Sequence, residues 1–118
     1  MSWIYNQANG SLSNTGFLIG SGYSGKGVGK NNPTMEDIPE VGPIPRGRYI
    51  IGDAFTHPHA GPVCMRLEPD AGDTMFGRSG FMMHGDNTTH TASEGCIIMP
   101  RDVREKIAAS SDRELIVL

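Results

Sequence analysis

The sequence predicts a single domain of the mainly β class, a β-rich α+β fold with one helix after Cys96. Three observations support this fold class. The chain has 118 residues, enough for one core but hardly for two. Its 16 Gly and 8 Pro form no repeat, a composition that favours short strands and irregular loops over a helical bundle. A helical pattern of apolar residues occurs only near the C-terminus. We therefore expect one small, sandwich-like domain over residues 1–118.

The first half of the chain is expected to hold three strands and a long loop. Residues 2–20 predict two short strands around Asn9-Gly10, because Asn-Gly readily adopts the positive φ angles of a tight hairpin. Residues 21–45 are rich in Gly, Asn and Pro without periodicity, and we expect an ordered surface loop there. A strand follows at Arg48–Ile51, where aromatic and β-branched residues favour the extended state.

Apolar and polar residues alternate from Val63 to Glu68, which predicts a half-buried strand. Val63, Met65 and Leu67 share the expected core face. Cys64 then lies on the opposite, partly exposed face, and we interpret it as a structural cysteine.

The remaining elements are a short strand, the helix and a last strand. The apolar run Phe81–Met83 predicts a buried strand that ends at His84, near a sheet edge. After Pro100, apolar residues recur every four positions, which predicts a helix. Residues 115–118 are all apolar and indicate an interior strand.

The charge balance excludes some function classes. Ten Lys and Arg against 13 Asp and Glu give a net charge of −3, the wrong sign for a nucleic-acid binder. No apolar run is long enough to span a bilayer, so we expect no membrane insertion. The first residues lack a basic segment followed by an apolar one, and we expect no standard export signal.

A glycine-rich segment imitates two nucleotide-binding motifs. Residues 20–25 match G-x-G-x-x-G, and residues 20–26 resemble part of a P-loop. Gly27 stands where a P-loop needs Ser or Thr, and the glycines and prolines that follow do not favour the required helix. The segment is better interpreted as a glycine loop that shapes a groove.

Histidines and an acid raise the alternative of a metal site. Imidazole and carboxylate groups suit zinc or a harder divalent ion, but the spacing here matches no compact ligand motif. We therefore expect no metal and no other cofactor. A metal-dependent peptidase stays a minor alternative, with candidate ligands His57, His59, His84, His90 and Asp86.

The strongest candidate chemistry joins His84 to Cys96. A cysteine nucleophile needs a base that forms the thiolate and amide donors that hold the oxyanion. His84 at a strand end and the Gly95-Cys96 turn supply both if the loop between them folds back. The alternative is a buried core cysteine and a structural histidine. A Cys64–Cys96 disulfide would disable this nucleophile, and the sequence leaves that pairing open.

These residues resemble the catalytic signature of the YkuD-type L,D-transpeptidases, in which a strand ending in His-Gly precedes Ser-x-Gly-Cys and an apolar pair. The chain is more closely similar to the L,D-transpeptidase-related effectors of the bacterial type VI secretion system. Glu94 and Ile98 depart from the housekeeping enzymes, which commonly carry His and Arg there. The likeness covers nearly the whole chain and rests on Gly22-Tyr23-Ser24-Gly25, Gly29-Lys30-Asn31-Asn32-Pro33, Gly42-Pro43-Ile44-Pro45-x-Gly47, Phe76-Gly77-Arg78-Ser79-Gly80-Phe81 and Ser93-Glu94-Gly95-Cys96-Ile97-Ile98.

The resemblance implies a small L,D-transpeptidase-like β-sandwich with the helix after a catalytic Cys96. The Cys96 thiolate would attack the carbonyl between the L-centre of diaminopimelate and the terminal D-alanine of a tetrapeptide stem. His84 would act as base and then acid, its tautomer held by a nearby carbonyl such as that of Gly85, while N–H groups of Gly95 and Cys96 stabilise the oxyanion. Hydrolysis, exchange with a D-amino acid and crosslinking all remain open.

The same resemblance suggests how the substrate is held. Diaminopimelate carries a carboxylate and an ammonium. A guanidinium can grip the carboxylate with two bonds, which makes Arg78 the candidate, and Asp86 or Glu94 would meet the ammonium. The full expected substrate-binding set is Arg78, Asp86, Ser93, Glu94, Tyr23, Lys30 and Asn31.

The resemblance also implies a biological setting. Such effectors are made in the cytoplasm, injected into the periplasm of a rival bacterium, and neutralised at home by a cognate immunity protein. The implied partners are peptidoglycan stem peptides, that immunity protein and secretion-system components. A non-catalytic peptidoglycan-binding or secretion-adaptor module is the alternative. An NlpC/P60-type peptidase fits poorly, because its nucleophile precedes its base along the chain.

Overall fold

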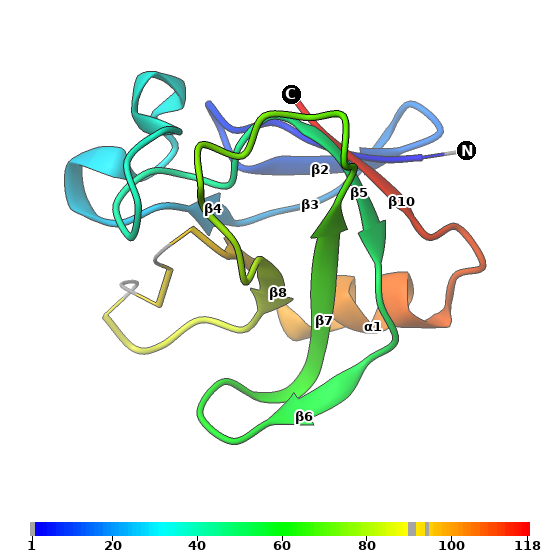
Figure 1. The fold of residues 1–118 in the computed structure, drawn as a ribbon. Coiled ribbons are helices and arrows are strands. Elements are labelled where there is room, and N and C mark those ends of the chain that lie inside the picture. The colour runs from blue at the N-terminus through cyan, green and yellow to red at the C-terminus, as the bar shows by residue number, and fades with distance from the viewer. Residues whose placement is uncertain (1, 90–91, 94) are drawn as a thin grey trace.

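The computed structural model describes residues 2–89, 92–93 and 95–118 of the chain. Ten strands and one α-helix build the described part, which confirms the mainly β class with a single helix. The strands follow the order β3-β2-β1-β10-β5-β7-β8-β9-β4, and β6 pairs with β7 beside this path. The sheet is strongly bent, and the N-terminal strands run across the direction of β7 (Figure 1).

The N-terminal segment forms three strands where two were expected. These are β1 (Trp3–Tyr5), β2 (Ser11–Asn14) and β3 (Phe17–Ser21), joined as antiparallel neighbours. The turn before β2 contains Asn9-Gly10 as predicted, with Gly10 at φ 73°. A second tight turn at Thr15 and Gly16, with φ of 52° and 83°, starts β3. Two successive positive φ angles are typical of a two-residue hairpin turn. The sequence predicted such a turn only at Asn9-Gly10, so the turn at Thr15 and Gly16 was missed.

The expected loop at residues 21–45 contains short regular elements. It forms β4 (Tyr23–Ser24) and two 3₁₀ turns, η1 (Gly27–Gly29) and η2 (Pro33–Met35). β4 pairs antiparallel with β9 at the far edge of the sheet from β3. This segment is therefore ordered, as predicted, but it also completes the sheet.

The two predicted central strands are present, and an additional short strand lies between them in the sequence. β5 (Gly47–Ile51) begins one residue before the expected strand and ends with it. β7 (Gly61–Pro69) contains the second expected strand, Val63–Glu68, and is longer at both ends. β6 (Phe55–His57), which the sequence analysis did not predict, pairs with the start of β7. β8 (Met82–His84) ends at His84 as expected.

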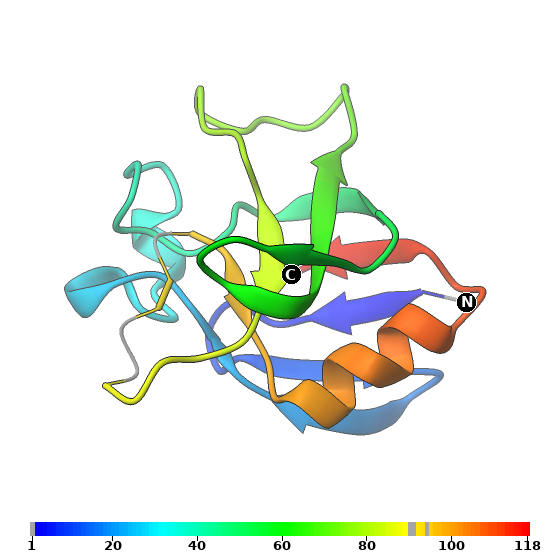
Figure 2. The ribbon, with the colours of Figure 1, turned by 90° about the horizontal axis from the view of Figure 1, so that it is seen from below.

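In the C-terminal part the helix and the last strand follow the prediction, whereas the short strand β9 was not predicted. β9 (Ile97–Ile98) leads into α1 (Arg101–Ala109), and β10 (Glu114–Val117) lies between β1 and β5 inside the sheet. The helix contacts β7, and its Val103 lies against Gly20 of β3. It therefore spans from the middle of the sheet to one edge strand (Figure 2). Within the described residues no helix is long and apolar enough to cross a membrane.

The core lies inside the bend and between the sheet and α1. Apolar side chains from most strands and from the helix fill this core. They are Trp3, Tyr5, Leu12, Ile44, Tyr49, Ile51, Met65, Leu67, Phe81, Met83, Ile97, Met99, Val103, Ile107, Leu115 and Val117. Removal of this apolar surface from water is the main force that stabilises the fold.

Cys64 departs from the prediction, because it is fully buried. The pairing of β6 with β7 shifts register between Phe55 and His57, and Val63 has a φ of 57°. This bulge interrupts the regular alternation of side chains from which a partly exposed position was predicted for Cys64. The Cys64 thiol donates to the carbonyl of Gly61 at 3.2 Å. Neither Cys64 nor Cys96 forms a disulfide in the structure.

Candidate active site

His84 and Cys96 come together because β8 and β9 are parallel neighbours. Their register pairs Met83 with Ile97 and His84 with Ile98. Met83 and Ile97 are fully buried in the core, and side chains alternate along a strand. His84 and Cys96 therefore lie on the other face, and both line one cavity of about 520 Å³. The fold-back of the intervening loop, on which the Cys/His hypothesis depended, is present.

The ring of His84 is held in one orientation. Its Nδ1 lies 2.8 Å from the carbonyl oxygen of Gly85. A carbonyl can only accept, so Nδ1 carries the proton and Nε2 keeps its lone pair. This is the contact with Gly85 that the sequence analysis expected. The tautomer leaves Nε2 as the atom able to take a proton.

Electrostatics also favour a neutral His84. Burial lowers its pKa below the usual value, and the Gly85 carbonyl partly opposes this. The positive charge of Arg104 and the neighbouring His57 lower the pKa further, while Asp86 raises it. The net direction is downward, so at neutral pH the imidazole is uncharged and can act as a base.

Ser93 shapes the turn before Cys96. Its fully buried hydroxyl donates to the Cys96 carbonyl at 2.6 Å. It accepts the N–H groups of Gly25 at 2.9 Å and Gly95 at 3.2 Å. One proton and two lone pairs are thereby used, so this hydroxyl is not the substrate contact we expected. The Gly95 N–H, an expected oxyanion donor, is likewise engaged within the turn.

Arg78 is buried instead of facing a substrate. Its guanidinium donates to the carbonyls of Glu36 at 2.6 Å, Pro43 at 2.7 Å and Gly42 at 3.0 Å. These bonds attach the loop after η2 to Arg78. The same guanidinium packs against the turn that carries Cys96, because a Cβ on Gly95 would lie 2.2 Å from Nη2 of Arg78. The bidentate grip on a substrate carboxylate that we expected does not fit a guanidinium committed in this way.

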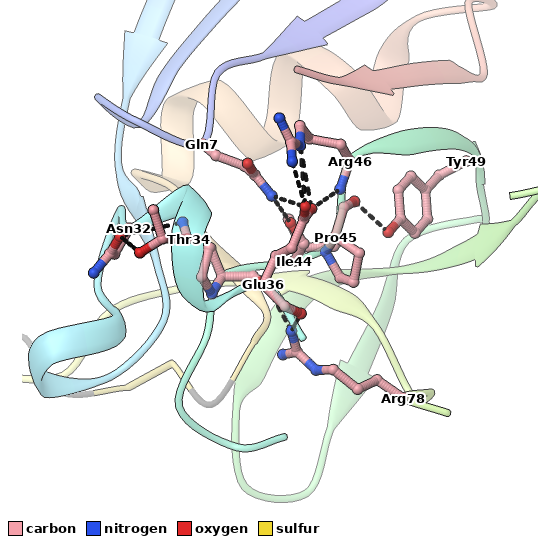
Figure 3. Close-up of polar contacts among 10 residues, drawn as sticks. Gln7, Asn32, Thr34, Glu36, Ile44, Pro45, Arg46, Tyr49 and Arg78 are labelled. Carbon is pink, nitrogen blue, oxygen red and sulfur yellow. Dashed lines mark hydrogen bonds and ion pairs between the residues drawn. The ribbon is translucent and has the colours of Figure 1, made fainter. Parts of the chain in front are cut away.

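A buried carboxylate supports the same loop from its other side (Figure 3). Glu36 accepts hydrogen bonds from the Gln7 side chain at 3.0 Å and from the Arg46 backbone at 2.9 Å, and it pairs with the Arg46 guanidinium at 2.5 Å. Burial alone would raise the pKa of Glu36, but these bonds outweigh it and lower the pKa. Sequence analysis missed Glu36, because nothing local shows that a loop glutamate will be covered.

Asp86 lines the same cavity as His84 and Cys96. Its Oδ1 accepts the hydroxyl proton of Tyr23 at 2.7 Å, and the same hydroxyl accepts the Ala92 N–H at 2.8 Å. Burial and the bond to Asp86 raise the pKa of Tyr23 to about 12. Tyr23 therefore orients Asp86 and the backbone at Ala92 and does not itself line this cavity.

Lys30 and Asn31 lie behind Tyr23. The Lys30 ammonium is 4.3 Å from the centre of the Tyr23 ring, and the Asn31 side chain accepts the Ser24 N–H at 3.2 Å. Neither lines a cavity that contains Cys96. The structure therefore does not place Lys30 and Asn31 in the wall of the groove, where the sequence analysis expected them. Glu94, also expected at the substrate, lies outside the described residues.

Arg104 is a second buried arginine that sequence analysis missed. Its guanidinium donates to the carbonyls of Met99 at 3.0 Å, Pro62 at 2.9 Å and Val63 at 3.1 Å. A Cβ on Gly85 would lie 2.8 Å from its Nη2. Arg104 therefore joins α1 to the β6–β7 hairpin directly beside the residue that holds His84. A charged residue on an amphipathic helix gives no local sign of such burial.

The histidines considered as metal ligands are divided. His57 and His59 line the 520 Å³ cavity together with His84, whereas His90 lies outside the described residues. No group of three or more His, Cys, Asp and Glu in the described part of the chain is arranged to hold a metal ion.

A comparison with protein families finds that residues 19–115 match the model of the Tlde1 domain. This match covers the strands, the loop and the turn that build the cavity around His84 and Cys96. A comparison with curated proteins finds no match to the chain.

Proposed function

The chain belongs to the Tlde1 domain family, the type VI secretion L,D-transpeptidase effectors, and on this premise we propose that it is a cysteine enzyme of peptidoglycan. Its substrate is the tetrapeptide stem, and it acts as an L,D-carboxypeptidase or L,D-transpeptidase. One observation carries the proposal. His84 and Cys96 line the same cavity from parallel strands, with the Nδ1 of His84 held by the Gly85 carbonyl.

The first half of the reaction forms a thioester. The Cys96 thiol passes its proton to Nε2 of His84, and Sγ adds to the carbonyl carbon between diaminopimelate and D-alanine. The C–N bond then breaks, and the amine of D-alanine leaves with the proton from His84. The stem is now attached to Cys96 through its diaminopimelate carbonyl.

The second half depends on the acceptor. Water adds to the thioester, gives a proton to His84 and releases a shortened stem, while the thiolate recovers that proton. The amine of a free D-amino acid gives exchange, and the amine of a second stem gives a crosslink. Each acceptor uses the same Cys96 and His84.

The tetrahedral intermediate carries a negative oxygen that needs donors. The Gly95 N–H donates to Ser93 within the turn. We assign the oxyanion donor to the backbone N–H of Cys96, the nucleophile of the proposed reaction. One such donor is typically worth about 3 kcal/mol of transition-state stabilisation. The Ser93 bonds fix the turn that presents it.

The setting of this activity is part of the proposal. An effector of this family is delivered into a target cell, and its producer needs a cognate immunity protein. Because peptidoglycan stems are exposed in the periplasm, we place the reaction in the periplasm of the target bacterium.

The test is mass spectrometry of purified tetrapeptide muropeptides incubated with the protein. We expect loss of D-alanine, or its exchange when another D-amino acid is added, with the intact protein and with Cys64→Ser. The control is matched, because Cys64 is the other cysteine of the chain, forms no disulfide and is fully buried. Cys96→Ala should abolish the change, and a chelator should not. Activity that survives Cys96→Ala would contradict the proposal.

A further inference from the structure

The β6–β7 hairpin brings two histidines, His57 and His59, to the cavity, and the proposed mechanism gives neither a role. Only His57 belongs to a strand of the hairpin, and its ring is held by the turn. His57 is the last residue of β6 and pairs with Gly61 across the turn. It is half-buried and lines the same 520 Å³ cavity as His84 and Cys96. The hairpin therefore forms one wall of the site, and its end is held by the bonds from Arg104 to the carbonyls of Pro62 and Val63.

The ring of His57 is fixed by its own turn. Its Nδ1 lies 3.1 Å from the backbone nitrogens of both His59 and Ala60, which donate to it. A ring nitrogen that accepts carries no proton, so the neutral ring has its proton on Nε2. The turn thereby holds His57 in the tautomer in which Nε2–H is a hydrogen-bond donor. Within the imidazole ring, Nε2 is separated by one carbon from the Nδ1 that the turn holds.

The cavity needs such a donor. A tetrapeptide stem with its scissile carbonyl at Cys96 carries two carboxylates nearby, one on D-alanine and one on the D-centre of diaminopimelate. The described residues that line the cavity include no Lys or Arg. Arg78, the expected carboxylate ligand, donates to three backbone carbonyls instead. Asp86 repels a carboxylate and suits the ammonium of diaminopimelate.

We infer that His57 binds a carboxylate of the substrate stem through its Nε2–H. The inference rests on the proposed function, because it assumes that the stem occupies this cavity. It gives the cavity two complementary sides, with Asp86 for the ammonium and His57 for a carboxylate. His57 is a binding residue and takes no part in proton transfer at the thiol.

The test compares His57→Asn with Thr56→Ala in steady-state kinetics on a synthetic tetrapeptide stem. The Oδ1 of asparagine can accept the two turn N–H groups, as in an Asx turn, while the donor at Nε2 is lost. Thr56 is exposed on the same strand and does not line the cavity. We expect His57→Asn to raise KM about tenfold with little change in kcat, the size of one hydrogen bond to a charged group. Thr56→Ala should change neither.

Two amidated stems identify the carboxylate. One ends in D-alaninamide, and the other carries an amide at the D-centre of diaminopimelate. Amidation of the group that His57 binds should raise the KM of the intact protein, and His57→Asn should then cause no further rise on that stem. An unchanged KM on the tetrapeptide, or an equal rise on all three stems, would overturn the inference.

Failure of the proposed function gives a different pattern. If the intact protein releases no D-alanine, calorimetry measures binding of the tetrapeptide to Cys96→Ala with and without His57→Asn. Binding that is about tenfold weaker in the double variant supports the carboxylate role of His57. Equal binding by the two variants overturns it.

Discussion

Two buried arginines, Arg78 and Arg104, flank the candidate site in similar ways and with different effects. Each donates to three backbone carbonyls, and the Nη2 of each lies against a glycine next to one of the two proposed catalytic residues. Arg78 lies against Gly95, which precedes Cys96, and Arg104 lies against Gly85, which follows His84. Arg78 attaches a loop near the thiol. Arg104 attaches a hairpin and a helix near the base.

The same charge acts differently at the two positions. Arg78 and Cys96 interact electrostatically, so the guanidinium favours the negative thiolate. Arg104 lowers the pKa of His84 and so disfavours the imidazolium. Arg78 thus favours the charged form of the proposed nucleophile, and Arg104 favours the neutral form of the proposed base. A buried guanidinium beside a glycine can therefore favour opposite charge states in the two members of the proposed catalytic pair.

Removal of Arg78 should have the largest effect of the changes that test this comparison. Arg78→Ala leaves three buried carbonyls without a donor, and we expect a loss of about 3 to 5 kcal/mol in the free energy of unfolding. Urea denaturation measures it. Arg78→Lys keeps the charge and should lose less. Arg48→Ala is the control, because the Arg48 side chain is exposed and pairs with Glu114 at 3.1 Å on the surface, so its loss should change stability by less than about 1 kcal/mol. Equal losses in Arg78→Ala and Arg48→Ala would contradict the structural role.

The two glycines should differ in their tolerance of a methyl group. Gly95 has a φ of 116°, and its Cβ would lie 2.2 Å from Arg78, so Gly95→Ala strains the backbone and displaces the turn. We expect a loss of about 100-fold in kcat/KM. Gly85 has no positive φ, and its Cβ would lie 2.8 Å from Nη2 of Arg104, so Gly85→Ala should cost only about tenfold. The reverse order in measured kcat/KM would break the comparison.

The effect of Arg104 on His84 should appear in the pH dependence. The acidic limb of kcat/KM reports His84, and activity rises as pH increases through its lowered pKa. Arg104→Gln removes a positive charge that disfavours the imidazolium, so the limb should move to higher pH. Arg104→Lys retains the charge and should leave the limb close to its original position. A limb that moves equally in both variants would show that packing, and not charge, sets the pKa.

The smallest expected effect concerns Glu36, which supports only the Arg78 side. Its pKa is lowered in the folded chain, so it stabilises the fold above its unfolded pKa, and that stability is lost as pH falls through the lower, folded value. Glu36→Gln should reduce the free energy of unfolding by about 1 kcal/mol at neutral pH and flatten its decline in acid. Thermal unfolding across pH 3 to 7 checks this, and an unchanged decline in the variant would exclude Glu36 as its source.

The sequence predicts the elements that carry the chemistry better than those that support them. An apolar run that ends at His84 and a four-residue periodicity after Pro100 are local patterns, and both elements formed where expected. The fates of Arg78 and Arg104 depend on carbonyls more than 30 residues away in the chain. No local pattern shows that such carbonyls will be buried beside a guanidinium. Cys64 was misjudged for a similar reason, because the bulge at Val63 arises from pairing with β6.

The most direct test of the central claim traps the stem on the protein. A tetrapeptide stem is mixed with the protein, the reaction is stopped with acid within milliseconds to seconds, and the digested protein is examined by mass spectrometry. The account predicts an adduct on Cys96 with the mass of the stem lacking D-alanine, reduced strongly in His84→Ala and absent from Cys64. Release of D-alanine without any adduct on Cys96, or an adduct that forms equally well in His84→Ala, would contradict it.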